Sequence, residues 1–500
     1  MPKVSHQISI PGLELNRASK IPAYKQVYGL LRTAILDHRL QPGQRLPSSR
    51  LLAESMGVSR NIILLAYEQL SLEGFIAGAT GNGSFVSGTL PDTKPKLPKD
   101  TVSPEEKNIA SNVTFQYPVS DSLMQRESEA ATIKPFQNPE PAMDHFPYRT
   151  WAKCAYRIFR NLEFESLNYH DAKGYLPLRT VIADYLRVNR AIRCGPEQIV
   201  ITTGTQQALN LAAAMLLKNN DRFWIEDPGY INARAVFEHA GGKTCPIPVH
   251  ADGMDVDHAM QKHPNATLCY ITPSHQFPAG GTLSITKRLK LLEWAAKKKM
   301  WIIEDDYDSE FQYGSNPVPA LQGLDPHKRV IYMGTFSKVL FPGLRIGYII
   351  LPDKEMADAF GYAKAFADRQ NGITDQLILH EFIHGDHLTI HIRRMRQLYK
   401  KRQEILLELI QRLGEELLQA DKQSGGMHVL AWLPKGMNDQ EVTDMLRLGG
   451  VYVAPLSRYT LKYKQPPALI LGYTAFNEKL LAQGVRTMVR MISEQASLLS

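Results

Sequence analysis

The sequence contains few cysteines and no long hydrophobic run. Its four cysteines, Cys154, Cys194, Cys245 and Cys269, show no CxxC spacing, which predicts free thiols in a reducing compartment rather than disulfides or a metal site. No segment approaches the roughly 18 uninterrupted apolar residues of a membrane helix, and the first residues lack the apolar core of a secretory signal. We therefore expect a cytoplasmic protein with no metal centre and no membrane partner.

A strong net charge is also missing, since 500 residues carry a formal charge of +8 at pH 7. This value alone does not indicate a nucleic-acid partner. The excess is uneven, because residues 1–90 hold nine Lys or Arg and five Asp or Glu, and 9 − 5 = +4 is half of the total. A chain of 500 residues exceeds what one hydrophobic core usually organises. We expect a small basic domain followed by a larger one.

A stretch rich in proline and charge divides the chain. Residues 91–107 read PDTKPKLPKDTVSPEEK and show no apolar period, which is typical of an extended, solvated linker. We therefore predict a first domain at 1–90, a linker at 91–135 and a second domain at 136–500. After residue 140, helical stretches such as Leu178 to Arg190 alternate with the apolar runs IVITTG, RFWIEDP, TLCYITP, MWIIEDD and RVIYMGT. This alternation predicts an α/β fold with a mostly parallel sheet.

Three helices and a hairpin are predicted between residues 23 and 86. The first helix runs from Ala23 to Asp37, Ser48 or Ser49 caps the second, Gly57 ends it, and Ser59 caps the third. The glycine-rich run FIAGATGNGSFV predicts a β-wing. Such an α+β arrangement is a winged helix-turn-helix. In the third helix, the side chains expected to face the core are Ile62, Ile63, Ala66, Tyr67 and Leu70.

The start of the third helix carries candidate DNA contacts. In this geometry Ser59, Arg60 and Asn61 point into a major groove, where arginine and asparagine can read guanine and adenine edges. Ser48 and Arg50 would lie beside phosphates. The alternative is a small helical interaction domain with solvated arginines. The segments LPSSRLLAESMGVSRN, AYEQLSLEGFI and GNGSFV resemble the GntR-type winged helix-turn-helix, which implies regulation through a dyad-symmetric operator in double-stranded DNA and therefore a homodimer.

A lysine in an apolar setting indicates a second kind of chemistry. The run GTFSKVLFPGLRIGYI, residues 334–349, places Lys338 between Ser337 and apolar residues. An amine in such a setting loses its proton more easily and can form a Schiff base with an aldehyde such as pyridoxal phosphate. A protein that holds this cofactor must neutralise its phosphate, pair its ring nitrogen with an acid, contact its ring hydroxyl and cover one ring face.

Each of these requirements has candidates. The run IVITTGTQQ passes from a buried strand through Gly204 into a helix whose first amides attract an anion. Asp305, at the end of the run MWIIEDD, is the expected partner of the ring nitrogen. Tyr307 is expected to reach the ring hydroxyl, and Tyr230 to stack on the ring. The candidates for phosphate contacts are Thr205, Gln206, Thr335, Ser337 and Arg345.

The motifs GTQQ, DPGY, DDYD and SKxxxPGxR follow the chain order of fold-type I aminotransferases, with 33 residues from Asp305 to Lys338. The resemblance covers about residues 140 to 495. It implies a large domain with a mostly parallel central sheet and a smaller carboxy-terminal α+β subdomain. By the same match, Tyr169 would reach the phosphate bound in the neighbouring subunit, which again implies a homodimer.

A winged helix fused to such a domain resembles the MocR/GabR subfamily of GntR regulators. The resemblance implies that the pyridoxal phosphate domain senses an amino compound, or the cofactor itself, and alters operator binding. Arg458 resembles the position that holds an effector carboxylate, although an ordinary surface arginine is the alternative. Asn232 stands where the GABA-responsive member has a second arginine, which weakens the case for GABA as ligand.

One departure argues against efficient catalysis. Phe277 stands where aminotransferases carry an asparagine before a proline, and His275 or Gln276 are candidates to compensate. The alternative for His275 is a structural role in a turn. The sequence thus predicts a pyridoxal phosphate-dependent, DNA-binding regulator that senses through Lys338, with residual transamination left open. The alternatives are an aminotransferase with a residual winged helix domain and a storage or trafficking protein for the cofactor.

Overall fold

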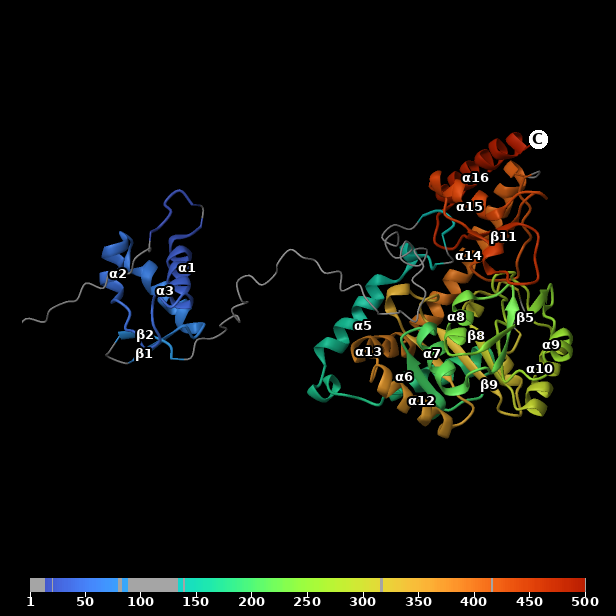
Figure 1. Ribbon diagram of the computed structural model, residues 1–500, viewed down its shortest axis with the longest axis horizontal. Helices are drawn as coiled ribbons and strands as arrows, with labels where there is room; N and C mark the ends of the chain where they lie inside the picture. The colour runs from blue at the N-terminus through green and yellow to red at the C-terminus, as the bar shows by residue number, and fades with distance from the viewer. Residues whose placement is uncertain are drawn as a thin grey trace, which may run out of the picture. The chain divides into compact units, whose positions relative to one another are not determined.

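The chain forms two compact units, Met1–Thr114 and Phe115–Ser500. The computed structural model describes residues 14–19, 21–79, 83–88, 134–137, 140–314, 318–414 and 417–499 (Figure 1). Most of the linker expected at 91–135 therefore lies outside the described residues. No helix in these ranges combines the length and the apolar character that a membrane span requires.

The small unit is a winged helix-turn-helix. It contains α1 (Ala23–Leu36), α2 (Ser49–Met56), α3 (Arg60–Leu72) and an antiparallel hairpin of β1 (Ile76–Ala79) and β2 (Gly83–Val86). The side-chain oxygen of Ser48 accepts the amide hydrogen of Leu51 at 3.3 Å and so caps α2. Gly57 ends this helix with φ of 63°, a left-handed conformation that glycine adopts without strain.

Two details of this unit differ from expectation. Ser59 precedes α3, but its side chain makes no capping hydrogen bond. Ile62 is only half-buried, because it lies near the exposed start of α3. The other predicted core residues of α3 are buried, namely Ile63, Ala66, Tyr67 and Leu70.

The large unit is built on an eight-stranded sheet of order β3-β10-β9-β8-β7-β4-β5-β6. The strands are β3 (Ile199–Thr202), β4 (Arg222–Asp227), β5 (Lys243–His250), β6 (Gly253–Met254), β7 (Leu268–Ile271), β8 (Trp301–Asp306), β9 (Val330–Thr335) and β10 (Gly347–Ile350). The pairs from β9 to β5 are parallel, whereas β10 runs antiparallel to both β3 and β9, and β6 to β5. The prediction of a mostly parallel sheet is confirmed.

Helices cover both faces of this sheet. On one face, alternate strand residues such as Val200, Ile303 and Ile331 pack against α7 (Thr205–Leu216), α8 (Ile231–His239) and α12 (Lys354–Ala367). On the other face lie α6 (Leu176–Arg190), α9 (Val256–Lys262), α10 (Ile285–Lys298) and α13 (Ile373–His384). Because both faces are covered, the strands read as continuous apolar runs and their polar residues appear only at strand ends.

Further elements surround this core. The segment before α6 forms α5 (Tyr148–Arg160) and the 3-10 helix η2 (Phe164–Leu167), and α11 (Leu321–Leu324) precedes β9. The remaining 3-10 helices are η1 (Met143–His145), η3 (Pro196–Gln198), η4 (Ser309–Phe311), η5 (Pro342–Leu344) and η6 (Leu456–Tyr459).

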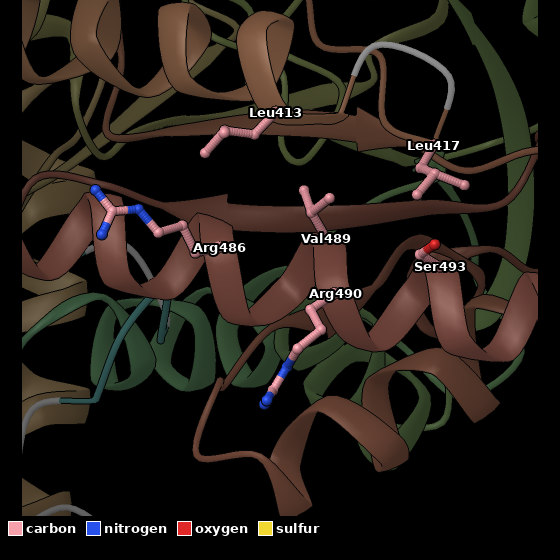
Figure 2. A pocket seen from close by; sticks show the side chains of 6 residues that line it. All are labelled: Leu413, Leu417, Arg486, Val489, Arg490 and Ser493. Carbon is pink, nitrogen blue, oxygen red and sulfur yellow. The ribbon is translucent and has the colours of Figure 1, made fainter.

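A smaller carboxy-terminal subdomain follows, as expected. It contains α14 (His387–Gly414), α15 (Asp439–Leu448), α16 (Glu478–Leu499) and a three-stranded sheet of order β11-β13-β12, formed by His428–Trp432, Ala468–Gly472 and Ala454–Pro455 (Figure 1). A cavity of about 360 Å³ lies between the end of α14 and α16, with Leu413 and Leu417 across from Val489 (Figure 2). None of the candidate site residues lines it.

Candidate functional site

Lys338 follows β9 at the edge of the sheet where the parallel strands end. Asp305, near the end of the neighbouring strand β8, pairs in register with Met333 of β9. The acid and the lysine segment therefore leave the sheet at the same edge, where ligands of open α/β sheets bind. Burial lowers the pKa of Lys338, although the carboxyl groups of Glu140 and Asp308 act in the opposite direction. A lowered pKa increases the fraction of nucleophilic amine.

Asp305 has one carboxylate oxygen available for a ligand. It is 4% exposed, and its Oδ2 accepts the Tyr270 hydroxyl hydrogen at 2.6 Å. Its Oδ1 is buried and has no hydrogen-bond partner among the described residues. Burial raises the pKa of Asp305 to about 7, while the bond from Tyr270 acts to lower it. A buried oxygen without a donor is costly, and a protonated ring nitrogen would satisfy it.

The neighbouring Asp306 is used differently. Its Oδ2 accepts hydrogen bonds from Nε of Arg190 at 2.8 Å and from the hydroxyl of Tyr332 at 2.6 Å. Arg190 and Asp306 are both buried, so Asp306 is the counter-charge of a buried guanidinium. This contrast supports the choice of Asp305 rather than Asp306 as the partner of the ring nitrogen.

The expected phosphate contacts gather around the start of α7. Gly204 precedes the helix with φ of 77°, and a Cβ atom there would lie 3.1 Å from Nη2 of Arg345. The same Nη2 donates to the carbonyl oxygen of Thr203 at 3.1 Å. The amides of Thr205 and Gln206 open the helix, where a partial positive charge favours an anion. Arginine and helix end together form a cationic corner.

Two hydroxyl groups complete this corner from the side of β9. Gly347 of β10 pairs with Thr202 on one side and with Thr335 on the other, so β10 links the start of α7 to the end of β9. The Oγ1 of Thr335 accepts the amide hydrogen of Ser337 at 3.1 Å. The Oγ of Ser337 is buried without a partner among the described residues, which suits a hydroxyl that donates to a phosphate oxygen.

Tyr230 and Phe277 form an aromatic wall. Tyr230 precedes α8, and its ring lies 6.5 Å from that of Tyr270 at an interplanar angle of 24°. Its hydroxyl accepts a hydrogen from Nδ2 of Asn232 at 3.2 Å. Burial, with a contribution from Asp305, raises the pKa of Tyr230 to about 12. The ring of Phe277 meets that of Tyr230 edge-on at 5.9 Å. A neutral phenol on an apolar wall is a suitable cover for a cofactor ring.

Gln276 does not supply the polar group that Phe277 lacks. Its Nε2 donates to the carbonyl oxygens of Pro228 and Phe277 at 2.9 and 2.7 Å, and its Oε1 accepts from the amide of Ala279 at 2.9 Å. The suggestion that Gln276 compensates is therefore wrong, because its amide is consumed in holding the turn. His275 instead contacts Tyr307, with 3.0 Å between its Nδ1 and the phenol oxygen.

Arg458 and Tyr169 come from segments outside the sheet. Arg458 lies half-buried in η6. The carbonyl oxygen of its neighbour Tyr459 accepts the amide hydrogen of Gly229 at 3.1 Å, which ties this segment to the turn that carries Tyr230. Tyr169 is 72% exposed, and the guanidinium of Arg369 lies 4.5 Å from its ring. Arg458 thus lies close to the candidate site, whereas Tyr169 faces outward.

The candidate DNA contacts share one surface of the small unit. Ser48, Arg50, Ser59, Arg60 and Asn61 are all exposed. Nε of Arg60 donates to Oγ of Ser49 at 3.2 Å, so the starts of α2 and α3 lie together. This is the side of a helix-turn-helix that meets a major groove, and their contact with DNA stays a prediction.

Three residues near the site were missed by the sequence patterns. Tyr270 donates to Asp305, Asp308 accepts from His275 at 2.9 Å, and the ring of His428 lies 5.3 Å from that of His275. Asp308 belongs to the motif DDYD and could have been considered with its neighbours. Tyr270 and His428 carry no such signal, because they reach the site from other strands.

Comparisons with known proteins agree with this arrangement. Residues 142–482 match the family "Aminotransferase class I and II", and residues 23–86 match "Bacterial regulatory proteins, gntR family". The chain is 35% identical over 480 residues to the probable rhizopine catabolism regulatory protein MocR of Rhizobium meliloti, covering 95% of each chain. The chain belongs to the MocR/GabR subfamily of GntR regulators. It is therefore a DNA-binding transcription regulator with an aminotransferase-like domain.

Other proteins similar to this MocR/GabR member include both transcription regulators and aminotransferases. The pyridoxine biosynthesis regulator PdxR of Corynebacterium glutamicum is 31% identical over 477 residues, covering 94% of each chain. The α-aminoadipate aminotransferase LysN of Thermus thermophilus, solved with N-(5'-phosphopyridoxyl)-L-leucine, superposes with a TM-score of 0.69 at 28% identity, covering 75% of this chain and 95% of its own. The cofactor of the large unit is pyridoxal phosphate, and the unpaired Oδ1 of Asp305 and Oγ of Ser337 fit it.

Proposed function

We propose that this regulator attaches pyridoxal phosphate to Lys338 and senses an amino compound that competes with that lysine. The observation that carries the proposal lies at one edge of the sheet, where a lysine with a lowered pKa and an aspartate come together. The buried Oδ1 of that aspartate has no donor in the part of the chain that the structure describes. When bound, the cofactor supplies an aldehyde carbon that links reversibly to an amine. An amino compound can then replace Lys338 as the group linked to the cofactor.

The surrounding side chains have separate roles in this proposal. Asp305 holds a proton on the ring nitrogen, and Tyr230 covers the ring. The cationic corner of Arg345 and the first turn of α7 binds the phosphate, assisted by the hydroxyls of Thr335 and Ser337. Because Arg345 is exposed on one side, this corner is also open to the phosphate as the cofactor enters.

Arg458 is the proposed contact for an acidic group of the effector. Its guanidinium can make a bidentate contact with a carboxylate, and its segment is fastened to the Tyr230 turn through Gly229. The exposed Asn232 provides no second cation there. Two relatives are named for rhizopine catabolism and for pyridoxine biosynthesis. A ligand screen should therefore test amino compounds and, separately, the cofactor itself.

Exposed aromatic side chains support a homodimer. Within the large unit, exposed apolar side chains gather on α5, η2 and α12, and Phe366 is 94% exposed. Monomeric proteins seldom expose so many large apolar groups in one region. A second copy of the chain would cover them and would bring Tyr169 toward a neighbouring site. The residues concerned are Tyr148, Tyr156, Phe159, Phe164, Leu167, Tyr169, Tyr362 and Phe366.

The decisive experiment compares the wild type with Lys338→Ala. Binding to the DNA upstream of the protein's own gene is measured by fluorescence anisotropy, with pyridoxal phosphate and with a panel of amino compounds. We expect sequence-specific binding by both proteins, a response to an amine only in the wild type, and loss of visible cofactor absorbance in the variant. An amine response of equal size in Lys338→Ala would reject the proposal.

A residual transaminase activity is the second candidate function. One observation favours it, since an aromatic-amino-acid aminotransferase of Thermococcus litoralis is 28% identical over 362 residues, which cover 71% of this chain and 87% of that protein. Steady turnover of an amino acid, combined with absence of sequence-specific DNA protection, would favour it over regulation. A cytoplasmic location follows from either function only as a prediction.

A further inference from the structure

Three side chains form a hydrogen-bonded chain next to the proposed cofactor site. Nδ1 of His275 lies 2.9 Å from Oδ2 of Asp308 and 3.0 Å from the hydroxyl of Tyr307. His275 and Asp308 are 3% and 1% exposed, so bulk water does not compete for these bonds. Asp308 also acts on the ammonium of Lys338, which places this chain close to the reacting amine.

The two contacts of Nδ1 fix the positions of the hydrogens. An ionised carboxylate has no hydrogen to donate, so Nδ1 of His275 must carry one and donate it to Asp308. This nitrogen then has no lone pair with which to accept the phenol hydrogen of Tyr307. The phenol hydrogen is therefore available for another acceptor, while the phenol oxygen is held near the N–H group of His275.

We propose that Asp308 and His275 are positioning residues that keep the phenol hydrogen of Tyr307 directed to the ring oxygen of pyridoxal phosphate. They would do so in place of the polar side chain that is missing at Phe277. This inference rests on the proposed function, because it assumes that Lys338 holds the cofactor. It adds that the sequence DDYD works as a unit, with Asp305 for the ring nitrogen and Asp308, through His275, for the ring oxygen.

A metal centre would use the same groups and is the competing interpretation of this cluster. His275, Asp308 and His428 offer one ligand atom each within 4.8 Å of one another. Ligands at about 2.0 to 2.2 Å from zinc lie roughly 3.0 to 3.6 Å apart. One nitrogen of each imidazole has a hydrogen-bond partner, and for His428 this is Nε2, which lies 3.0 Å from the carbonyl oxygen of Pro278. Nε2 of His275, Nδ1 of His428 and Oδ1 of Asp308 have no partner among the described residues, so the zinc assay below is a necessary part of the test. The hydrogen-bonded chain accounts for the observed distances without any movement.

Several charged groups face Tyr307, so the test must separate the loss of a negative charge from the loss of a hydrogen-bond donor. The carboxyl groups of Asp308, Asp305, Glu226 and Asp306 all act on its phenol, and the ammonium of Lys338 acts on His428. Removing a nearby negative charge disfavours a proton on the Lys338 nitrogen of the loaded protein, which lowers the pH at which its absorbance titrates. Removing a hydrogen-bond donor from the ring oxygen has the opposite effect, because that donor stabilises the negative charge left when the proton leaves.

The experiment measures the pH midpoint of cofactor absorbance in the loaded, full-length protein. Tyr307→Phe should raise the midpoint by about 1 to 2 pH units, the equivalent of one hydrogen bond to a charged group. Asp308→Asn should also raise it, since His275 would then accept the phenol hydrogen. Glu226→Gln is the matched control. It removes a buried carboxyl that acts on Tyr307 by charge and not by a hydrogen bond, so the pH midpoint of the absorbance should fall or stay the same.

A double substitution separates positioning from a general effect on folding. In the Tyr307→Phe background, Asp308→Asn should not raise the midpoint further, because the hydrogen that it redirects is gone. In the cofactor-free protein, ¹⁵N NMR of labelled histidine should show the His275 hydrogen on Nδ1. A lowered or unchanged midpoint in Asp308→Asn would overturn the inference, and so would an additive upward shift in the double variant.

The outcome is distinguishable from failure of the proposed function. If the wild type shows no lysine-linked absorbance at all, the proposed function fails first. If the wild type shows it and Asp308→Asn leaves the midpoint unmoved, only the positioning role fails. Stoichiometric zinc in the purified protein that is lost in His428→Ala would also overturn the inference, since the three groups would then be metal ligands.

Discussion

Replacing Asp305 by asparagine should stabilise the cofactor-free protein at alkaline pH while weakening its hold on the cofactor. Asp305 is buried with one unpaired oxygen, and burial raises its pKa from 3.8 to about 7. A group whose folded pKa lies above its unfolded value contributes stability below the unfolded pKa, and that stability is lost as the pH rises through the folded pKa. For Asp305 the loss extends from about pH 4 to pH 7.

The size of the effect follows from these two values. Between pH 5 and pH 8, a carboxyl that titrates at 3.8 unfolded and about 7 folded costs the folded state about 2 to 3 kcal/mol. Asparagine does not titrate. Between pH 5 and pH 8 the free energy of unfolding of Asp305→Asn should therefore fall less than that of the wild type, and the difference should equal this amount. Glu304 is present in both proteins and cancels in the comparison, whereas the carboxyl of Asp305 helps to raise the pKa of Glu226, so its removal changes the slope in the same direction.

The assay is urea unfolding followed by tryptophan fluorescence at pH 5 and pH 8. All five tryptophans lie after residue 150, so the signal reports the large unit alone. The matched variant is Asp306→Asn, which removes the carboxylate that pairs with the buried guanidinium of Arg190. It should destabilise the protein at both pH values by about 3 to 5 kcal/mol.

Adding the cofactor should make the wild type more stable than Asp305→Asn, the reverse of their order in the cofactor-free protein at alkaline pH. The ring nitrogen pairs with ionised Asp305, so the cofactor affinity of Asp305→Asn should drop by about 100-fold to 4,000-fold, the equivalent of the roughly 3 to 5 kcal/mol that breaking a buried ion pair costs. The reasoning would be refuted if the variant kept the pH slope of the wild type, or if its cofactor affinity were unchanged. The first result would mean that the pKa of Asp305 is not raised in the folded protein, and the second that the unpaired oxygen of Asp305 does not face the ring nitrogen.

Three further predictions concern other parts of the molecule. Arg60→Ala should cost roughly 1 to 3 kcal/mol of operator discrimination in competition binding if the arginine reads a base edge, whereas equal weakening on all DNA would indicate a phosphate contact. Gly204→Ala should destabilise the large unit by about 1 to 3 kcal/mol in urea unfolding, since its φ of 77° and ψ of 177° suit glycine alone, and it should lower cofactor affinity in a titration, since its Cβ would lie 3.1 Å from Arg345 and displace the guanidinium. Tyr156→Glu combined with Phe159→Glu should convert a dimer to a monomer in light scattering, and a monomeric wild type would contradict the proposed interface.

The fold was largely predictable because its signals are local. Runs such as MWIIEDD become strands buried on both faces, and helices fill the intervals, as α6 does between Leu176 and Arg190. The position of β10 was not predictable. This strand lies antiparallel between β3 and β9, and nothing in its short run of Gly347 to Ile350 differs from a parallel strand.

The site residues were predictable where a motif lies at the end of a strand. They were not predictable where the contact comes from a residue distant in the sequence. Asp305 and Lys338 are recognisable from their flanking runs, and the structure brings their segments to one edge of the sheet. Gln276 was misjudged, because hydrogen bonds to Pro228 and Ala279 consume its amide. The sequence gives no measure of whether an amide faces a ligand or its own turn. The contacts of Tyr270 and His428 depend on strand neighbours that only the folded sheet supplies.

The loss of the polar side chain at Phe277 suits a sensor better than an enzyme. Occupancy reports the concentration of a ligand only when chemistry is slow relative to dissociation. A site that kept the amine linkage of Lys338 but catalysed poorly would therefore remain at binding equilibrium with its effector. Equilibrium occupancy is also what thermodynamic coupling requires, because an effector that changes operator affinity by some factor has its own affinity changed by operator DNA to the same extent. Rapid turnover would break this reciprocity, so slow chemistry at the Lys338 site is what the proposed sensing requires.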